Sequence, residues 1–120
     1  MMLYHGTSKD NYNSIKKNGF DISKSGSNSS STYGKAIYFT NCYKTAKEYA
    51  NCTGIVIQVY IVDIQSLKLE KDYCPTNKNH LKEINGIILY LKINSNKNCF
   101  LSLNKNEYAF FNKFNYKIIN

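Results

Sequence analysis

The sequence predicts an α+β fold with a largely antiparallel sheet. Two short segments with helical character come early in the chain, whereas segments with the pattern of strands dominate the later part. A length of 120 residues can enclose one hydrophobic core but not two, so residues 1–120 are expected to form a single domain. We find neither an internal repeat nor a linker between domains.

Both helices are expected in the N-terminal half, the first of them after a short strand that ends near Leu3 to His5. Asp10 is a suitable cap for a helix over residues 11–17, and Gly19 can end that helix in a left-handed conformation. Residues 23–32 are nearly all Ser, Gly, Asn and Lys, which indicates a mobile loop.

A second strand is predicted over residues 35–39. Asn41 can then cap a helix over residues 43–51, with Ala46 and Ala50 on its packing side. These two elements complete the mixed first half of the chain.

The C-terminal half is predicted to be mainly strands. Residues 55–64, rich in β-branched side chains, give the strongest strand signal. A turn is expected at residues 75–77, and residues 80–84 could form one helical turn. Further strands are predicted at residues 87–93, 100–103, 108–111 and 116–119.

The charge is strongly basic, since the chain has 16 Lys, no Arg and a net charge of +8. Such a surface can attract nucleic acid, the phosphates of a small ligand or an acidic partner, although the Lys- and Asn-rich composition explains the charge equally well. The absence of Arg excludes any site that needs a planar bidentate fork.

The cysteines are widely spaced and only two His accompany them, so we expect reduced thiols and no metal site. They are Cys42, Cys52, Cys74 and Cys99. The N-terminus lacks the basic stretch and apolar core of a secretory signal, and the longest apolar run, residues 54–62, is too short to cross a bilayer. We therefore expect an intracellular, cytoplasmic protein.

Three segments carry residues suited to binding and chemistry. In the first, residues 3–8, the backbone of Gly6 can pair with a carboxamide and His5 can bond a ribose hydroxyl. In the second, Tyr38 at a strand end and Tyr49 on the next helix could hold a flat ligand between two rings. Taken on its own, the first segment could be only a turn, and each tyrosine of the second could simply pack in the core.

The third segment, residues 104–111, places Glu107 where a polar loop meets an apolar strand. A carboxylate near a ribose can stabilise an oxocarbenium-like transition state by electrostatics. A solvated carboxylate with a structural role is the alternative for Glu107 on its own.

In this order the segments resemble the catalytic domain of poly(ADP-ribose) polymerases and diphtheria-toxin-like ADP-ribosyltransferases. The first resembles that family's His-Gly-Ser/Thr strand. The second resembles its Gly-Lys-Gly-Ile-Tyr-Phe segment with a helical Tyr eleven residues later, as Tyr49 is from Tyr38, and the third its Asn-Glu-Tyr strand entry. Residues 114–119 resemble the family's final strand, so the resemblance implies a split antiparallel sheet in minimal form.

The resemblance also implies roles for individual residues. The implied catalytic residues are His5, Tyr38 and Glu107, and the implied NAD+-binding residues are His5, Gly6, Thr7, Tyr38 and Tyr49. His5 would bond the adenosine ribose, and the two tyrosines would sandwich the nicotinamide. Three positions depart from the family's pattern: Ala36 replaces a second Gly, Thr45 is displaced from a Ser position, and Asp21 stands where some members have Arg.

The implied activity is transfer of ADP-ribose from NAD+, used as co-substrate without a metal, to a protein or nucleic-acid acceptor. The short region before Glu107, residues 94–106, favours mono- over poly-ADP-ribosylation. An NAD+ glycohydrolase and an inactive NAD-binding module remain alternatives. The branches that resemble cholera toxin or the tRNA 2′-phosphotransferases depend on Arg, and the absence of Arg from this chain excludes them. We expect a monomer without membrane attachment.

Overall fold

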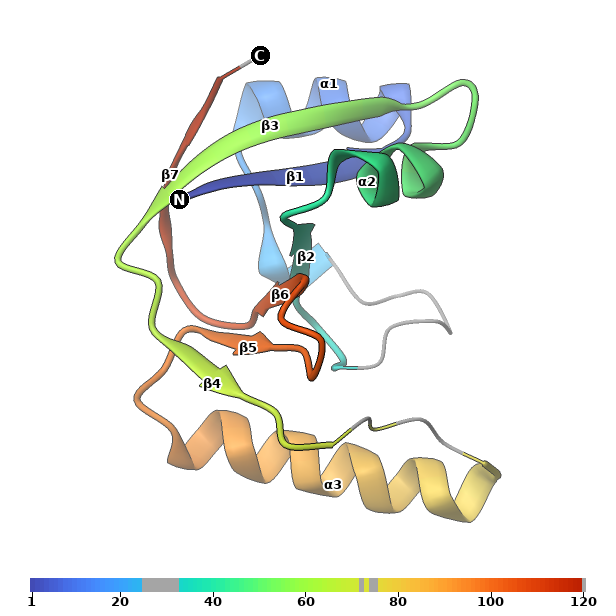
Figure 1. Ribbon diagram of the computed structural model, residues 1–120, viewed down its shortest axis with the longest axis vertical. Helices are drawn as coiled ribbons and strands as arrows, with labels where there is room; N and C mark the ends of the chain where they lie inside the picture. Colours follow the sequence, from blue (N-terminus) through green and yellow to red (C-terminus); the bar gives the residue numbers. More distant parts are fainter. Residues whose placement is uncertain (25–32, 72, 74–75, 120) are drawn as a thin grey trace.

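The computed structural model describes residues 1–24, 33–71, 73 and 76–119 (Figure 1). The helices are α1 (Lys9–Asn18), the short 3₁₀ helix η1 (Ile22–Lys24), α2 (Tyr43–Ala50) and α3 (Lys78–Asn94). The strands are β1 (Met2–Thr7), β2 (Ile37–Thr40), β3 (Ile55–Val62), β4 (Ser66–Lys68), β5 (Cys99–Leu101), β6 (Glu107–Phe110) and β7 (Asn115–Ile118).

All seven described strands form one sheet in the order β4-β5-β6-β2-β1-β3-β7. Neighbouring strands run antiparallel except β4 and β5, which are parallel. The predicted α+β class with a mainly antiparallel sheet is therefore confirmed. β1 occupies an inner position between β2 and β3, which brings the first motif of the chain to the centre of the sheet.

Helices cover both faces of the sheet, but at different places. Tyr12 and Ile15 of α1 pack on the face formed by alternate residues such as Leu3 and Ile57. The helix α2 lies on the opposite face of β1 and β3, and α3 covers the far end of the molecule near β4 and β5 (Figure 1). The two faces thus have separate cores, and both contribute walls to the site described below.

The ends of α1 and α2 differ in detail from the sequence prediction. Ser8, not Asp10, caps α1: its hydroxyl accepts a hydrogen bond from the Asn11 amide at 3.2 Å, so Asp10 lies inside the first turn. Gly19 does end α1 with a positive φ of 81°, as predicted. Asn41 does not cap α2, because its side chain instead donates to the Lys105 carbonyl at 3.2 Å.

The largest correction concerns α3, since residues 87–93 are helix and not the predicted strand. The Asn77 side chain accepts a hydrogen bond from the His80 amide at 2.8 Å and starts the helix, which then continues for 17 residues. Ile84 and Ile88 are buried one turn apart. An aliphatic run fits either structure, and packing against the sheet selects the helix.

The remaining C-terminal strands are confirmed, each beginning one residue before its predicted start. The short elements η1 and β4 were not predicted. Most of the predicted loop over residues 23–32 and part of the predicted turn at residues 75–77 lie outside the described residues.

Candidate active site

The close contact between α2 and the sheet depends on two glycines. A Cβ on Gly6 would overlap the Ala46 carbonyl oxygen and lie 2.8 Å from the Ala50 amide nitrogen. A Cβ on Gly54 would overlap the Ala50 carbonyl oxygen. With Ala46 and Ala50 as the buried residues of α2, the helix backbone rests directly on β1 and β3. This contact sets where Tyr49, the residue before Ala50, can lie.

The backbone polar groups of Gly6 face away from β3. The Met1 ammonium donates to the Ile61 carbonyl at 2.8 Å and the Ile61 amide donates to the Met1 carbonyl at 2.9 Å, so these two residues form a hydrogen-bonded pair. In an antiparallel ladder such pairs alternate. The odd-numbered residues of β1 therefore bond β3, and the N–H and C=O of Tyr4 and Gly6 face the side of β2.

The strands β1 and β2 stop pairing before Gly6, where the His5 side chain forms the hydrogen bond that a backbone group of β1 would otherwise form. The two strands pair at Tyr4↔Thr40, so continuation of the ladder would set Gly6 opposite Tyr38. The Tyr38 carbonyl instead accepts a hydrogen bond from His5 Nδ1 at 2.6 Å. The N–H and C=O of Gly6 are thus directed to the point where the sheet splits.

This hydrogen bond also defines the state of His5. Burial lowers the pKa of the imidazole, and the bond to the Tyr38 carbonyl opposes that shift only in part. Because a carbonyl can only accept, Nδ1 carries the proton of the neutral ring and Nε2 is left as an acceptor. A neutral His5 can therefore accept a hydrogen bond from a hydroxyl group.

Aromatic side chains hold the His5 ring. Phe20 meets it edge-on, with ring centroids 5.4 Å apart, and Phe39 lies at 5.5 Å. The Phe20 amide donates to the Tyr116 hydroxyl at 2.9 Å, which ties the turn after α1 to β7. His5 is therefore fixed by parts of the chain far apart in sequence.

Tyr38 uses its hydroxyl within the protein. This group accepts from the Tyr33 amide at 3.0 Å and donates to the Gly34 carbonyl at 3.3 Å, and the two tyrosine rings lie nearly parallel with centroids 6.1 Å apart. The ring of Tyr38, and not its hydroxyl, is then the part suited to contact a flat ligand. Tyr33 was not singled out in the sequence analysis.

Lys92 of α3 is a second residue that sequence reasoning missed. Its ammonium group donates to the Lys35 carbonyl at 3.4 Å, and burial lowers its pKa. No local motif marks Lys92, because α3 meets the turn before β2 only in the folded chain. The turn that holds the Tyr38 hydroxyl is thus braced from α3.

Glu107 is the first residue of β6, one residue before the predicted start of that strand, and a hydrogen-bonded turn fixes its backbone. Its amide donates to the Ser102 hydroxyl at 3.1 Å, and that hydroxyl donates to the Asn104 side-chain oxygen at 2.7 Å. The side chain is half-buried, and burial raises the pKa of the carboxyl. A partly desolvated carboxylate interacts more strongly with a nearby positive charge than a solvated one does.

Glu107 and Tyr49 interact electrostatically. Tyr49 is 63% exposed, and the Glu107 carboxylate is the main reason that its pKa is raised. Glu107 also lies directly opposite Thr40, which lies opposite Tyr4, so these three side chains share the face of the sheet that α2 covers. The Glu107 side chain thus lies on the same face of the sheet as α2, within electrostatic range of Tyr49.

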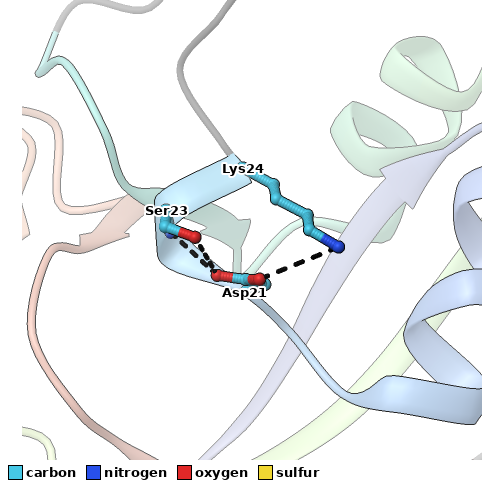
Figure 2. Close-up of polar contacts among 3 residues, drawn as sticks. All are labelled: Asp21, Ser23 and Lys24. Atoms are coloured by element: carbon cyan, nitrogen blue, oxygen red, sulfur yellow. Dashed lines mark hydrogen bonds and ion pairs between the residues drawn. The ribbon is translucent and has the colours of Figure 1, made fainter.

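The remaining expected residues have mainly local contacts. Thr7 ends β1 and is buried. Asp21, at the position where some family members have Arg, is engaged in local contacts. Its carboxylate accepts hydrogen bonds from the Ser23 amide at 3.0 Å and the Ser23 hydroxyl at 2.6 Å, and the Lys24 ammonium lies 4.0 Å away (Figure 2). These Ser23 bonds lower the pKa of Asp21. The positive charge of Lys24 lowers it further.

One cavity in the described part of the chain lies away from these residues. With a volume of about 250 Å³, it lies beside α3 and is lined by Lys71, Tyr73, His80, Glu83, Ile84 and Ile87, none of them an expected site residue. Among the described residues no three His, Cys, Asp or Glu side chains group together as metal ligands, and no helix has the length and hydropathy to cross a membrane.

Comparison with known proteins gives a match at the level of a family. The family model of the poly(ADP-ribose) polymerase catalytic domain matches residues 1–118. No individual curated protein and no solved structure shows significant similarity to the chain.

Proposed function

The chain belongs to the poly(ADP-ribose) polymerase catalytic domain family, and from this premise we propose that it transfers single ADP-ribose units from NAD+ to a macromolecular acceptor. The observation that carries the proposal is the hydrogen bond from His5 to the Tyr38 carbonyl. It stands where β1 and β2 stop pairing, next to the Gly6 backbone groups that face away from β3.

The groups around the split fit the parts of NAD+. An N–H and a C=O on one residue complement a carboxamide, which has both a C=O and an NH₂ group, so Gly6 binds the nicotinamide end. The rings of Tyr38 and Tyr49 provide flat surfaces for the pyridine ring. Nε2 of neutral His5 accepts from a ribose hydroxyl, and Thr7 follows Gly6 at the end of β1.

Glu107 acts on the ribose next to the nicotinamide. Its carboxylate accepts a hydrogen bond from a ribose hydroxyl and stabilises the positive charge that develops on the sugar. The bond from C1′ to the nicotinamide nitrogen breaks, and its electron pair leaves with neutral nicotinamide. An oxygen or nitrogen of the acceptor forms the new bond to C1′ and loses its proton to Glu107 or to solvent.

The short connection before Glu107 supports transfer of single units. Between the end of α3 at Asn94 and the start of β6 lies only β5 with two short connections, the second of which is folded tightly on Ser102. Elongation of a polymer needs an additional site for the end of the growing chain. The connections in this region have too few residues to form such a site.

The proposal can be tested with NAD+ labelled in its adenosine half and a mixed lysate as the source of acceptors. We expect release of nicotinamide together with label on macromolecules. Nicotinamide release without transfer would identify an NAD+ glycohydrolase, and NAD+ binding without turnover would identify a binding module. If NAD+ neither bound nor reacted, the proposed function would be wrong.

A further inference from the structure

Part of the sheet face that carries α2 is left uncovered. Tyr60 and Val62 of β3 are 45% and 43% exposed, and Met2 of β1 is 38% exposed. β3 is an inner strand, paired with β1 on one side and β7 on the other. Large apolar side chains exposed in the middle of a sheet are unusual on a surface without a partner.

Three tyrosines follow one another across this face. Tyr43 of α2 meets Tyr4 of β1 edge-on, with ring centroids 5.6 Å apart. Tyr60 lies diagonal to Tyr4, since Met2 pairs with Tyr60 and Tyr4 with Gln58. Diagonal neighbours of this kind are about 7–8 Å apart, within reach of aromatic side chains.

A lysine flanks each end of this tyrosine stripe. Lys117 of β7 lies directly opposite Tyr60 in the register of the sheet. Lys47 follows Tyr43 by four residues, so the two lie on the same side of α2. The stripe, defined by Tyr4, Tyr43 and Tyr60, thus runs between two cations.

The charges on the elements that form this face favour an anionic partner. In β1, α2, β3 and β7 the charged residues are Lys44, Lys47, Glu48 and Lys117, with His5 neutral. Within the described ranges the ion pair of Lys24 with Asp21 is the only one, so these lysines are available to a ligand. The chain as a whole carries a net charge of +8.

The stripe leads to the candidate active site. Tyr4 lies opposite Thr40, and Thr40 lies opposite Glu107, all three on the same face. Two strand spacings separate Tyr4 from Glu107, which is about 10 Å. A ligand extended along the stripe can therefore present a nucleophile near Glu107.

We propose that the tyrosine stripe binds single-stranded nucleic acid and that this strand is the acceptor of ADP-ribose. Unpaired bases stack on exposed aromatic rings, while lysines contact the phosphates between them. A duplex hides the faces of its bases, and an acidic peptide would engage the lysines but leave the rings without flat partners. The role as acceptor rests on the proposed transferase activity, whereas the binding of the strand does not.

Binding is tested without NAD+, by fluorescence anisotropy with a labelled single-stranded oligonucleotide of mixed sequence. We expect affinity that falls with added salt and a roughly tenfold loss in Tyr60→Thr, the size expected for one stacked base. Lys117→Gln should weaken binding and lower the salt dependence by about one phosphate contact. Because Lys117 is exposed, this second variant tests the stripe even if Tyr60→Thr folds poorly.

Matched controls lie on α3, at the other end of the molecule (Figure 1). Tyr90, which is 65% exposed, and Lys82 carry the same chemistry away from the stripe. Tyr90→Thr and Lys82→Gln should leave the affinity unchanged. Absence of oligonucleotide binding, or equal losses in the stripe and control variants, would overturn the proposal.

Turnover then separates this inference from the proposed function. With NAD+ present, Tyr60→Thr should still release nicotinamide but should label the oligonucleotide less than the unmodified protein does. Oligonucleotide binding with the expected pattern but no NAD+ turnover would refute the transferase and leave the nucleic-acid surface standing. Label on proteins but not on the oligonucleotide would refute the nucleic-acid acceptor and leave the transferase standing.

Discussion

The two sides of the split sheet are built in opposite ways. On one side His5 is enclosed by Phe20 and Phe39 and tied to the Tyr38 carbonyl. On the other side Tyr49 is 63% exposed and Glu107 is half-buried with a raised pKa. The His5 side has its geometry before any ligand arrives, whereas the side of Tyr49 and Glu107 can gain contacts when a ligand binds.

This difference separates stability from activity. Residues on the enclosed side contribute to folding through buried contacts, so their loss affects the whole domain. On the open side Tyr49 is largely exposed, so its loss should affect ligand binding before it affects folding. A partly buried carboxylate such as Glu107 can even lower stability, because burial of a charge is unfavourable.

The largest effect is expected for Glu107→Gln, which keeps the shape of the side chain and removes its charge. NAD+ binding should survive while turnover falls roughly 10²-fold or more, the scale for loss of one transition-state stabiliser. Nicotinamide release and calorimetric NAD+ binding measure the two quantities. Glu48→Gln, on the exposed side of α2, is the control, and near-normal turnover of Glu107→Gln would show that Glu107 has been misassigned.

Gly6→Ala should act on stability, because the added methyl group overlaps the Ala46 carbonyl and pushes α2 from the sheet. Overpacking of this kind costs about 1–3 kcal/mol. Gly86→Ala is the matched control: apart from the adjacent residues and the helix's own backbone, nothing lies within 4 Å of its added Cβ, so this helix-interior change should stabilise by about 0.5–1 kcal/mol. Denaturant unfolding of both variants measures the contrast, and equal stabilities would contradict the close seating of α2.

Tyr49→Ala should weaken NAD+ binding by about 0.5–1.5 kcal/mol, the contribution of an aromatic stacking face beyond its buried area. The thermal midpoint should not change, because the side chain is largely exposed. Titration with NAD+ and thermal unfolding test both halves of the statement. A drop in the thermal midpoint with unchanged affinity would place Tyr49 in the core and outside the ligand site.

The smallest effect is in the dependence of stability on pH, where the two sides should differ in sign. The pKa of His5 is lowered from 6.5, so the unfolded chain takes up this proton first and stability falls as pH drops below 6.5. The pKa of Glu107 is raised from 4.5, so the folded chain keeps its proton longer and stability falls as pH rises above 4.5.

The two contributions oppose each other between pH 4.5 and 6.5, so thermal unfolding across pH should resolve each one in the variant that lacks the other. His5→Phe should remove the slope below 6.5, and Glu107→Gln should remove the slope above 4.5. Identical profiles for the unmodified protein and Glu107→Gln would show that Glu107 is not desolvated.

Much of the fold could be read from local patterns. The β-branched run of β3, the stop at Gly19 and the small residues of α2 all predicted their elements correctly. The aliphatic residues of α3 were misassigned because Ile and Leu suit a buried strand as well as a helix. Asn41 looks like a cap in sequence, but in the folded chain its side chain bonds to the turn before β6.

The sequence alone determined the family resemblance and the candidate residues, since these depend on residue type and spacing along the chain. It also set the basic charge and the absence of Arg. Only the tertiary structure decided which atoms are available. The Tyr38 carbonyl, 33 residues from His5, accepts the hydrogen bond of the imidazole Nδ1–H next to Gly6, and no local pattern encodes a hydrogen bond between two strands.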